Sequence, residues 1–163
     1  MKKLILVSLL IATLLVSSNV AYANDRSKDA SYSIVPTEGT PAKGNIGWAE
    51  GFASPTRSTS VTYWYNQITK TATNQVRVYG KTNTSTITTK VENYIVLQQW
   101  NGSTWVTYNS YCGSTTNTNS CISSSYKTVS RDKYYRIKSY HRAYSGSSII
   151  DEKVIYSSYI YVD

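Results

Sequence analysis

The chain has 163 residues and a formal net charge of +8, from 17 Lys and Arg against 9 Asp and Glu. One His and two Cys leave too few ligands for a His- or Cys-based metal site, and the chain has no C-x-x-C redox spacing. We therefore expect neither a metal nor another cofactor. The positive charge favours polyanions as partners without choosing among them.

The first 23 residues predict an export signal. Two lysines follow Met1, Leu4–Val16 is an apolar stretch, and Ala21-Tyr22-Ala23 matches an A-x-A cleavage site. The apolar stretch is short for a membrane span, which needs about 20 residues. We expect a helical signal peptide, residues 1–23, to be cleaved, and no transmembrane segment in the mature chain. The mature protein would be secreted, would keep a net charge of +6 and has the length of one domain.

Residues 24–45 mix charged side chains with two prolines and two glycines. This composition predicts a flexible N-terminal arm ahead of a single domain, residues 46–163. The domain is rich in Tyr, Thr, Ser and Val, and no segment of it keeps a helical apolar stripe. Side chains that branch at Cβ or carry rings fit pleated sheets, so we expect an all-β domain.

Alternating apolar residues predict strands over residues 46–52, 59–65, 75–81 and 87–100. Asn101-Gly102 follows the last of these and favours a tight hairpin. Trp100 and Trp105 flank this turn. We expect the two rings to pair across the strands, because cross-strand aromatic pairs commonly stabilise sheets. An exposed platform for a sugar ring is the alternative.

Cys112 and Cys121 are the only cysteines, and eight residues separate them. In an oxidising exterior such a pair most simply forms a disulfide that closes a short loop. The Ser-, Thr- and Asn-rich residues 113–125 fit this loop, and residues 125–129 predict a short strand after it.

Residues 134–144 predict a half-buried strand, because successive strand side chains point to opposite faces. The inner face would carry Tyr135, Ile137, Ser139, His141 and Ala143. The segment 127–142 has a local charge of +5. On the outer face, cations could meet anionic groups while rings stack on sugars; the alternative is a solvated face that prevents aggregation. The candidate binding residues of the outer face are Tyr134, Arg136, Lys138, Tyr140, Arg142 and Tyr144.

Residues 145–148 predict a turn into a last strand over residues 149–162. Several short strands at this spacing predict a two-sheet antiparallel β-sandwich.

Three stretches carry a resemblance to a known family. Leu97-Gln98-Gln99-Trp100-Asn101-Gly102-Ser103-Thr104-Trp105-Val106, Tyr134-Tyr135-Arg136-Ile137-Lys138 and Ser157-Ser158-Tyr159-Ile160-Tyr161-Val162 resemble an uncharacterised family of small secreted proteins of Gram-positive bacteria. The resemblance implies export and a β-sandwich, and no activity. Tyr135-Arg136-Ile137-Lys138-Ser139 is also similar to fibronectin type III and other immunoglobulin-like domains, which implies a corner tyrosine at Tyr135 whose hydroxyl bonds to nearby backbone.

No motif of the chain points to catalysis. It lacks G-x-S-x-G and H-E-x-x-H, and its one histidine, His141, falls on the inner strand face. We expect a secreted, non-catalytic protein at the cell wall or outside the cell that binds an anionic wall polymer or a polysaccharide. The alternatives are an antibacterial or toxin-like effector and a hydrolase of cell wall or glycan. Nucleic acid is disfavoured because exported proteins seldom meet it, and the oligomeric state stays open.

Overall fold

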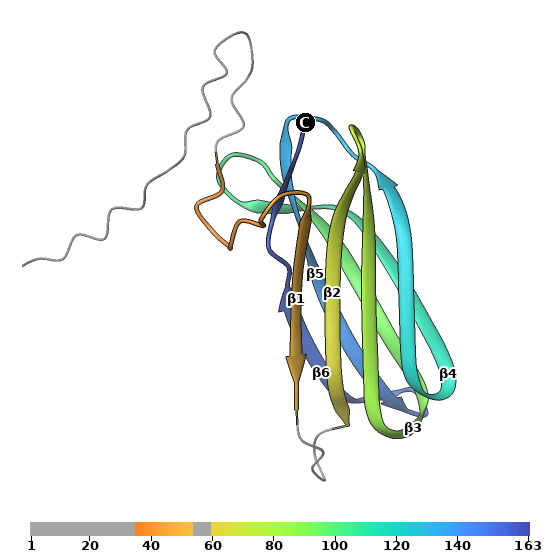
Figure 1. Ribbon diagram of the computed structural model, residues 1–163. Coiled ribbons are helices and arrows are strands. Elements are labelled where there is room, and N and C mark those ends of the chain that lie inside the picture. Colours follow the sequence, from red (N-terminus) through yellow and green to blue (C-terminus); the bar gives the residue numbers. More distant parts are fainter. Residues whose placement is uncertain (1–34, 54–59) are drawn as a thin grey trace, which may run out of the picture. The chain divides into compact units, whose positions relative to one another are not determined.

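The computed structural model describes residues 35–53 and 60–163, and these contain seven β-strands and no helix (Figure 1). The all-β prediction is confirmed. The predicted signal peptide and residues 24–34 of the predicted arm lie outside the described residues. The strands are β1 (Ile46–Phe52), β2 (Val61–Ala72), β3 (Gln75–Trp100), β4 (Trp105–Thr128), β5 (Lys133–Ser145), β6 (Ser148–Tyr156) and β7 (Ile160–Val162).

Strand β3 organises the sheet because it is long enough to have different neighbours along its length. Residues 75–84 pair with β2, residues 90–99 pair with β5, and β4 pairs along the other edge of β3. All pairs of strands are antiparallel. The register shifts between Asn83 and Thr88, where the sheet bends over on itself.

The bend divides the sheet into two facing layers. The first layer contains β1, β2, the start of β3 and the end of β4. The second layer contains the start of β4, the end of β3, β5, β6 and β7. The layers of the predicted antiparallel sandwich are present. However, β3 and β4 run continuously through both layers, so the two layers are parts of one curled sheet (Figure 1).

Two local predictions are wrong for the same reason. The two strands predicted over residues 75–81 and 87–100 are one continuous strand, β3. The loop predicted over residues 113–125 is part of strand β4. Thr, Ser and Asn are common in loops, but Thr also fits pleated strands. The bend of β4 contains Asn117 with φ of 50°, a left-handed conformation that asparagine tolerates better than most residues.

The predicted disulfide is wrong, because Cys112 and Cys121 are free thiols, one exposed and one buried, that pair with residues of β3 twelve positions apart, Tyr94 and Thr82. Cys121 is buried and its Sγ lies 3.6 Å from the carbonyl oxygen of Gly113. Cys112 is exposed and lies near Glu92 on the outer side of the second layer. The residues between the two cysteines pair with β3 instead of closing a loop.

The separation of the two thiols has a direct chemical test. We expect a thiol reagent to label one cysteine per folded chain and two per unfolded chain, because Cys112 is exposed and Cys121 is buried. Burial also raises the pKa of both thiols, so labelling requires mildly alkaline buffer. Intact mass after labelling with and without urea measures this. If the unfolded chain also takes up no label, the two cysteines are joined in a disulfide and the labelling prediction is wrong.

The core lies between the two layers. Ile68, Val76 and Val78 of the first layer pack with residues of the second layer, among them Leu97 and Ile137. The five residues predicted for the inner face of residues 134–144 are all buried, as the alternation requires.

Two predicted aromatic features are confirmed. The Tyr135 hydroxyl donates a hydrogen bond of 3.0 Å to the Ser130 carbonyl, which makes it the expected corner tyrosine, and burial raises its pKa to about 12. Trp100 and Trp105 pair across the hairpin with ring centroids 5.4 Å apart. Both rings are buried, so they stabilise the sheet and offer no exposed platform.

His141 lies in a polar part of the interior near the bend of β3. Its Nδ1 is 2.8 Å from the Thr82 hydroxyl and 3.2 Å from Asn93 Oδ1. The Asn93 amide donates to the carbonyl oxygens of Gly80 and Cys121. His141 Nε2 has no hydrogen-bond partner among the described residues. The network therefore accommodates a neutral ring that carries its proton on Nδ1.

The described part of the predicted arm contacts the second layer. The Ala42 N–H donates to the Tyr159 carbonyl at 2.8 Å, and the Tyr159 N–H donates to the Thr40 carbonyl at 2.9 Å. Trp105 Nε1 donates to the Glu38 carbonyl at 3.0 Å. These bonds hold residues 38–42 beside the segment that links β6 and β7.

Candidate functional site

The predicted binding residues share the outer face of the second layer, which we call the β5 face. Five of the six are partly exposed, and Tyr144 is buried. The structure adds three rings from other strands: Tyr94 of β3, Trp105 of β4 and Tyr156 of β6. Sequence analysis missed these rings because their proximity depends on strand register. The six predicted residues are Tyr134, Arg136, Lys138, Tyr140, Arg142 and Tyr144.

Arg136 lies at the centre of the β5 face between two rings. Its guanidinium carbon is 4.4 Å from the centroid of Trp105 and 4.7 Å from that of Tyr156. Its Nε donates a hydrogen bond of 2.9 Å to Gln98 Oε1. Burial lowers the pKa of Arg136, while the nearby Tyr156 and Glu38 raise it; a guanidinium stays charged at neutral pH in any case.

Lys138 continues this arrangement along the strand. Its ammonium is 4.8 Å from the ring centroid of Tyr140 and 5.5 Å from that of Tyr156. Hydrogen bonding to these two tyrosines raises the pKa of Lys138. Among the described residues, neither Arg136 nor Lys138 forms an ion pair. The centre of the β5 face therefore presents two cations that are not held in ion pairs with described carboxylates.

Arg142 differs because two carboxylates neutralise it. Its Nε lies 2.5 Å from Glu152 Oε2, and its Nη1 lies 3.1 Å from Glu92 Oε1. Burial raises the pKa of Glu92, but hydrogen bonds from Lys90, Arg142 and Tyr144 outweigh it and lower that pKa. This end of the β5 face is an internally satisfied ion network with little charge left for a ligand.

Tyr144 belongs to the same network. Its hydroxyl donates a hydrogen bond of 3.0 Å to Glu92 Oε1, and the Lys90 ammonium lies 3.7 Å above its ring. The ring is thus covered and cannot stack on a ligand. At the other end of the β5 face, the Tyr134 ring contacts Tyr161 and Tyr159, with centroids 4.9 Å and 5.6 Å away. The binding part of the face consequently centres on residues 134–140.

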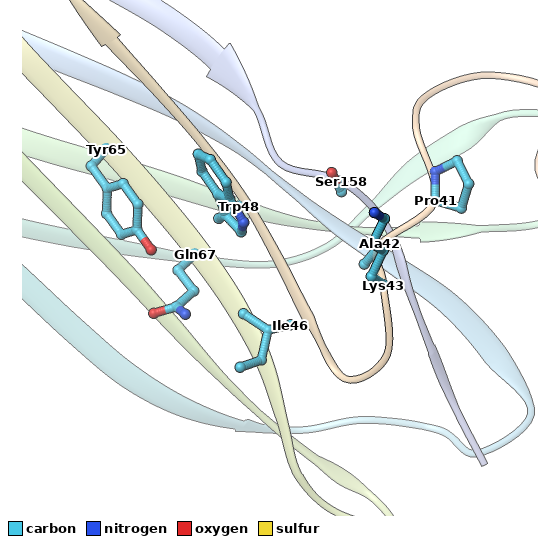
Figure 2. Close-up of a pocket in the computed structure, with 8 residues that line it drawn as sticks. All are labelled: Pro41, Ala42, Lys43, Ile46, Trp48, Tyr65, Gln67 and Ser158. Carbon is cyan, nitrogen blue, oxygen red and sulfur yellow. The ribbon is translucent and has the colours of Figure 1, made fainter.

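A second candidate lies outside the first layer, and sequence analysis missed it. A shallow hollow of about 620 Å³ opens beside β1 and β2 (Figure 2). Tyr65 and Gln67 are neighbours on one face of β2, and the pairing of β1 with β2 brings Trp48 beside them. The predicted strands over residues 46–52 and 59–65 include some of its residues, but the sequence did not indicate that the two strands pair. The lining residues are Pro41, Ala42, Lys43, Ile46, Trp48, Tyr65, Gln67 and Ser158.

Searches for other chemistry gave negative results. Within residues 35–53 and 60–163, no three His, Cys, Asp or Glu side chains are grouped so as to hold a metal ion. In that part of the chain, no helix has the length and apolar character to cross a membrane. No family model, curated protein or solved structure matches the chain. The two candidate sites are therefore judged by their geometry.

Proposed function

We propose that the chain is an exported, non-catalytic β-protein that binds an anionic polymer of the cell envelope through the β5 face. The observation that supports this proposal is the pair Arg136 and Lys138, whose charges are held between aromatic rings without an ion pair among the described residues. Phosphate or carboxylate groups are the ligands that such cations recognise.

The rings make the two cations better binding groups than ordinary surface charges. Contacts with Trp105, Tyr140 and Tyr156 restrict the long side chains before a ligand arrives. A side chain that is already ordered loses less conformational entropy on binding. Arg136 and Lys138 are two residues apart on one strand face, about 7 Å at the usual rise per residue. They can therefore contact successive anionic groups of an extended polymer.

The position of the only histidine supports a non-catalytic role. His141 is fully buried between the layers and bonded to Thr82 and Asn93. A polymer on the outer face cannot reach its ring. General acid–base catalysis by histidine requires contact with the reacting group, so the β5 face would bind its polymer without the help of this side chain.

The first test removes the two unpaired cations. We expect the double variant Arg136→Ser/Lys138→Ser to bind purified, phosphate-bearing cell wall at least about tenfold more weakly, because two charge-assisted contacts are lost. Binding of the unaltered protein should weaken steeply as salt is added. Co-sedimentation with wall, before and after chemical removal of its phosphate polymer, measures both effects.

A matched control carries the same loss of charge elsewhere. Arg77 of β3 and Lys127 of β4 belong to the first layer, so Arg77→Ser/Lys127→Ser lowers the net charge equally without touching the β5 face. It should bind wall within about twofold of the unaltered protein. Equal weakening of the two double variants would mean that net charge alone drives retention, and would refute the assignment of the site.

A further inference from the structure

The outer side of the first layer carries a group of exposed rings, which we call the aromatic face. Trp48 and Phe52 of β1 are 51% and 71% exposed. Folded proteins seldom expose connected apolar surface unless it serves an interaction. The rings come from three neighbouring strands and all point away from the core. The members of the aromatic face are Trp48, Phe52, Tyr63, Tyr65 and Tyr79.

The rings of the aromatic face contact one another across the strands. Trp48 and Tyr65 are nearly parallel, with an interplanar angle of 25° and centroids 6.4 Å apart. The Tyr79 ring follows at a centroid distance of 5.9 Å from Tyr65, but it is turned by 69° and meets Tyr65 edge to face. Phe52 and Tyr63 form a second contact at 4.9 Å. A continuous path of rings thus crosses from β1 through β2 to β3.

Polar groups lie beside this path. The hollow at the β1 end places the Gln67 amide below the rings of Trp48 and Tyr65, and Lys43 lies across β1 from them (Figure 2). Lys81 holds its ammonium 5.7 Å from the Tyr63 ring. The face therefore combines flat apolar surfaces with hydrogen-bonding groups at their edges.

We propose that the aromatic face binds a polysaccharide of β-linked, gluco-configured pyranose residues. The equatorial substituents of such sugars leave two faces of C–H bonds, whose weakly positive hydrogens meet the negative face of an aromatic ring. The sugar hydroxyls then lie at the ring edges, where Gln67 and Lys43 can bond to them. The nearly parallel rings of Trp48 and Tyr65, with centroids 6.4 Å apart, offer adjacent stacking surfaces to neighbouring sugar residues of an extended chain.

This site is separate from the β5 face. The two layers enclose the core between them, so their outer surfaces point in opposite directions. The β5 face attracts a charged polymer, whereas stacking on the aromatic face needs no charge. The two proposals can therefore be tested separately. Added salt should weaken binding of a charged polymer to the β5 face and leave binding of a neutral glycan to the aromatic face nearly unchanged.

The test uses neutral hexasaccharides as probes. By titration calorimetry we expect the purified protein to bind cellohexaose or chitohexaose, and the α-linked maltohexaose at least about tenfold more weakly, because its curved chain cannot follow the path of rings. Trp48→Ala and Tyr65→Ala should each weaken binding of the β-linked probe by about tenfold or more. Trp48 is half exposed on an edge strand, so its loss leaves the core intact.

Tyr156→Ala is the matched control, because it removes a partly exposed ring from the β5 face and leaves the aromatic face unchanged. Its affinity for the hexasaccharides should equal that of the unaltered protein. No binding of either β-linked probe, or equal affinity of Trp48→Ala and Tyr156→Ala, would overturn the proposal. Sedimentation that shows self-association lost only in Trp48→Ala would instead assign the face to a second copy of the chain.

Discussion

Acidification from pH 6.5 to pH 5 should lower the free energy of unfolding by about 1.5 kcal/mol through His141 alone. Burial lowers the pKa of this ring from its usual 6.5 to about 3. Between those values the unfolded chain binds a proton that the folded chain cannot accept, so stability falls as the pH falls. Down to pH 3 the loss reaches about 4 kcal/mol, and below pH 3 both states are protonated and the loss stops.

The physical cause is the position of Nε2. Thr82 and Asn93 contact Nδ1, while Nε2 has no partner among the described residues. A proton added to Nε2 would be a buried donor without an acceptor, on a ring that has also become charged. The fully enclosed ring leaves no route by which water could relieve this cost without local opening.

The pH range of the stability loss distinguishes the effect of His141 from that of the carboxylates. Burial raises the pKa values of Glu92 and Asp151, but hydrogen bonds outweigh it and lower both, so these groups lose their stabilisation only at more acidic pH. Urea unfolding at pH 6.5 and pH 5 therefore reports on His141. His141→Gln, which keeps polar atoms but does not titrate, should show almost no difference between the two pH values.

Equal pH slopes for the unaltered protein and His141→Gln would contradict the prediction. Should the variant fail to fold, the ring itself gives the answer by NMR. Its carbon-bound protons should keep the same chemical shifts from pH 7 to pH 4, because a neutral ring with a pKa of about 3 does not titrate there. If the His141 ring of the folded protein titrates near pH 6.5, that result also contradicts the prediction.

The residues of β5 were predictable because one side of that strand is buried. Period-2 alternation then places Tyr135, Ile137 and His141 inside, and nothing outside the segment is needed to see it. The same alternation identifies which residues of β5 share its outer face. It could not show that Glu92 of β3 and Glu152 of β6 neutralise Arg142, because those contacts depend on register with two other strands.

The bend of β3 and β4 was not predictable from local composition. Thr, Ser and Asn occur both in loops and in solvent-exposed strands, so residues 113–125 fit either structure. The disulfide, predicted from an even pair of cysteines in an exported chain, is absent because the residues between the cysteines pair with β3. The aromatic face was missed for a related reason: Trp48, Tyr65 and Tyr79 are far apart in sequence and meet only through the pairing of three strands.

Gly47→Ala should destabilise the fold by about 2–3 kcal/mol, an unusually large effect for one added methyl group. Gly47 is buried in β1, and a Cβ there would overlap the carbonyl oxygen of Ser158 and lie 3.2 Å from a methyl group of Ile68. The overlapping atom belongs to the backbone, so no side-chain rotation can relieve the clash. Strand β1 or the segment between β6 and β7 has to move.

Gly80→Ala provides the matched control for urea unfolding. It adds the same methyl group to a buried position of β3, where the nearest atom, at 3.1 Å, is the end of the Ile95 side chain. That side chain can shift, so the cost should stay below about 1 kcal/mol. Movement of β1 would also displace Trp48 from Tyr65. Gly47→Ala should therefore weaken binding of the β-linked hexasaccharide while Gly80→Ala preserves it, and equal stability of the two variants would show that the Gly47–Ser158 contact is not a close one.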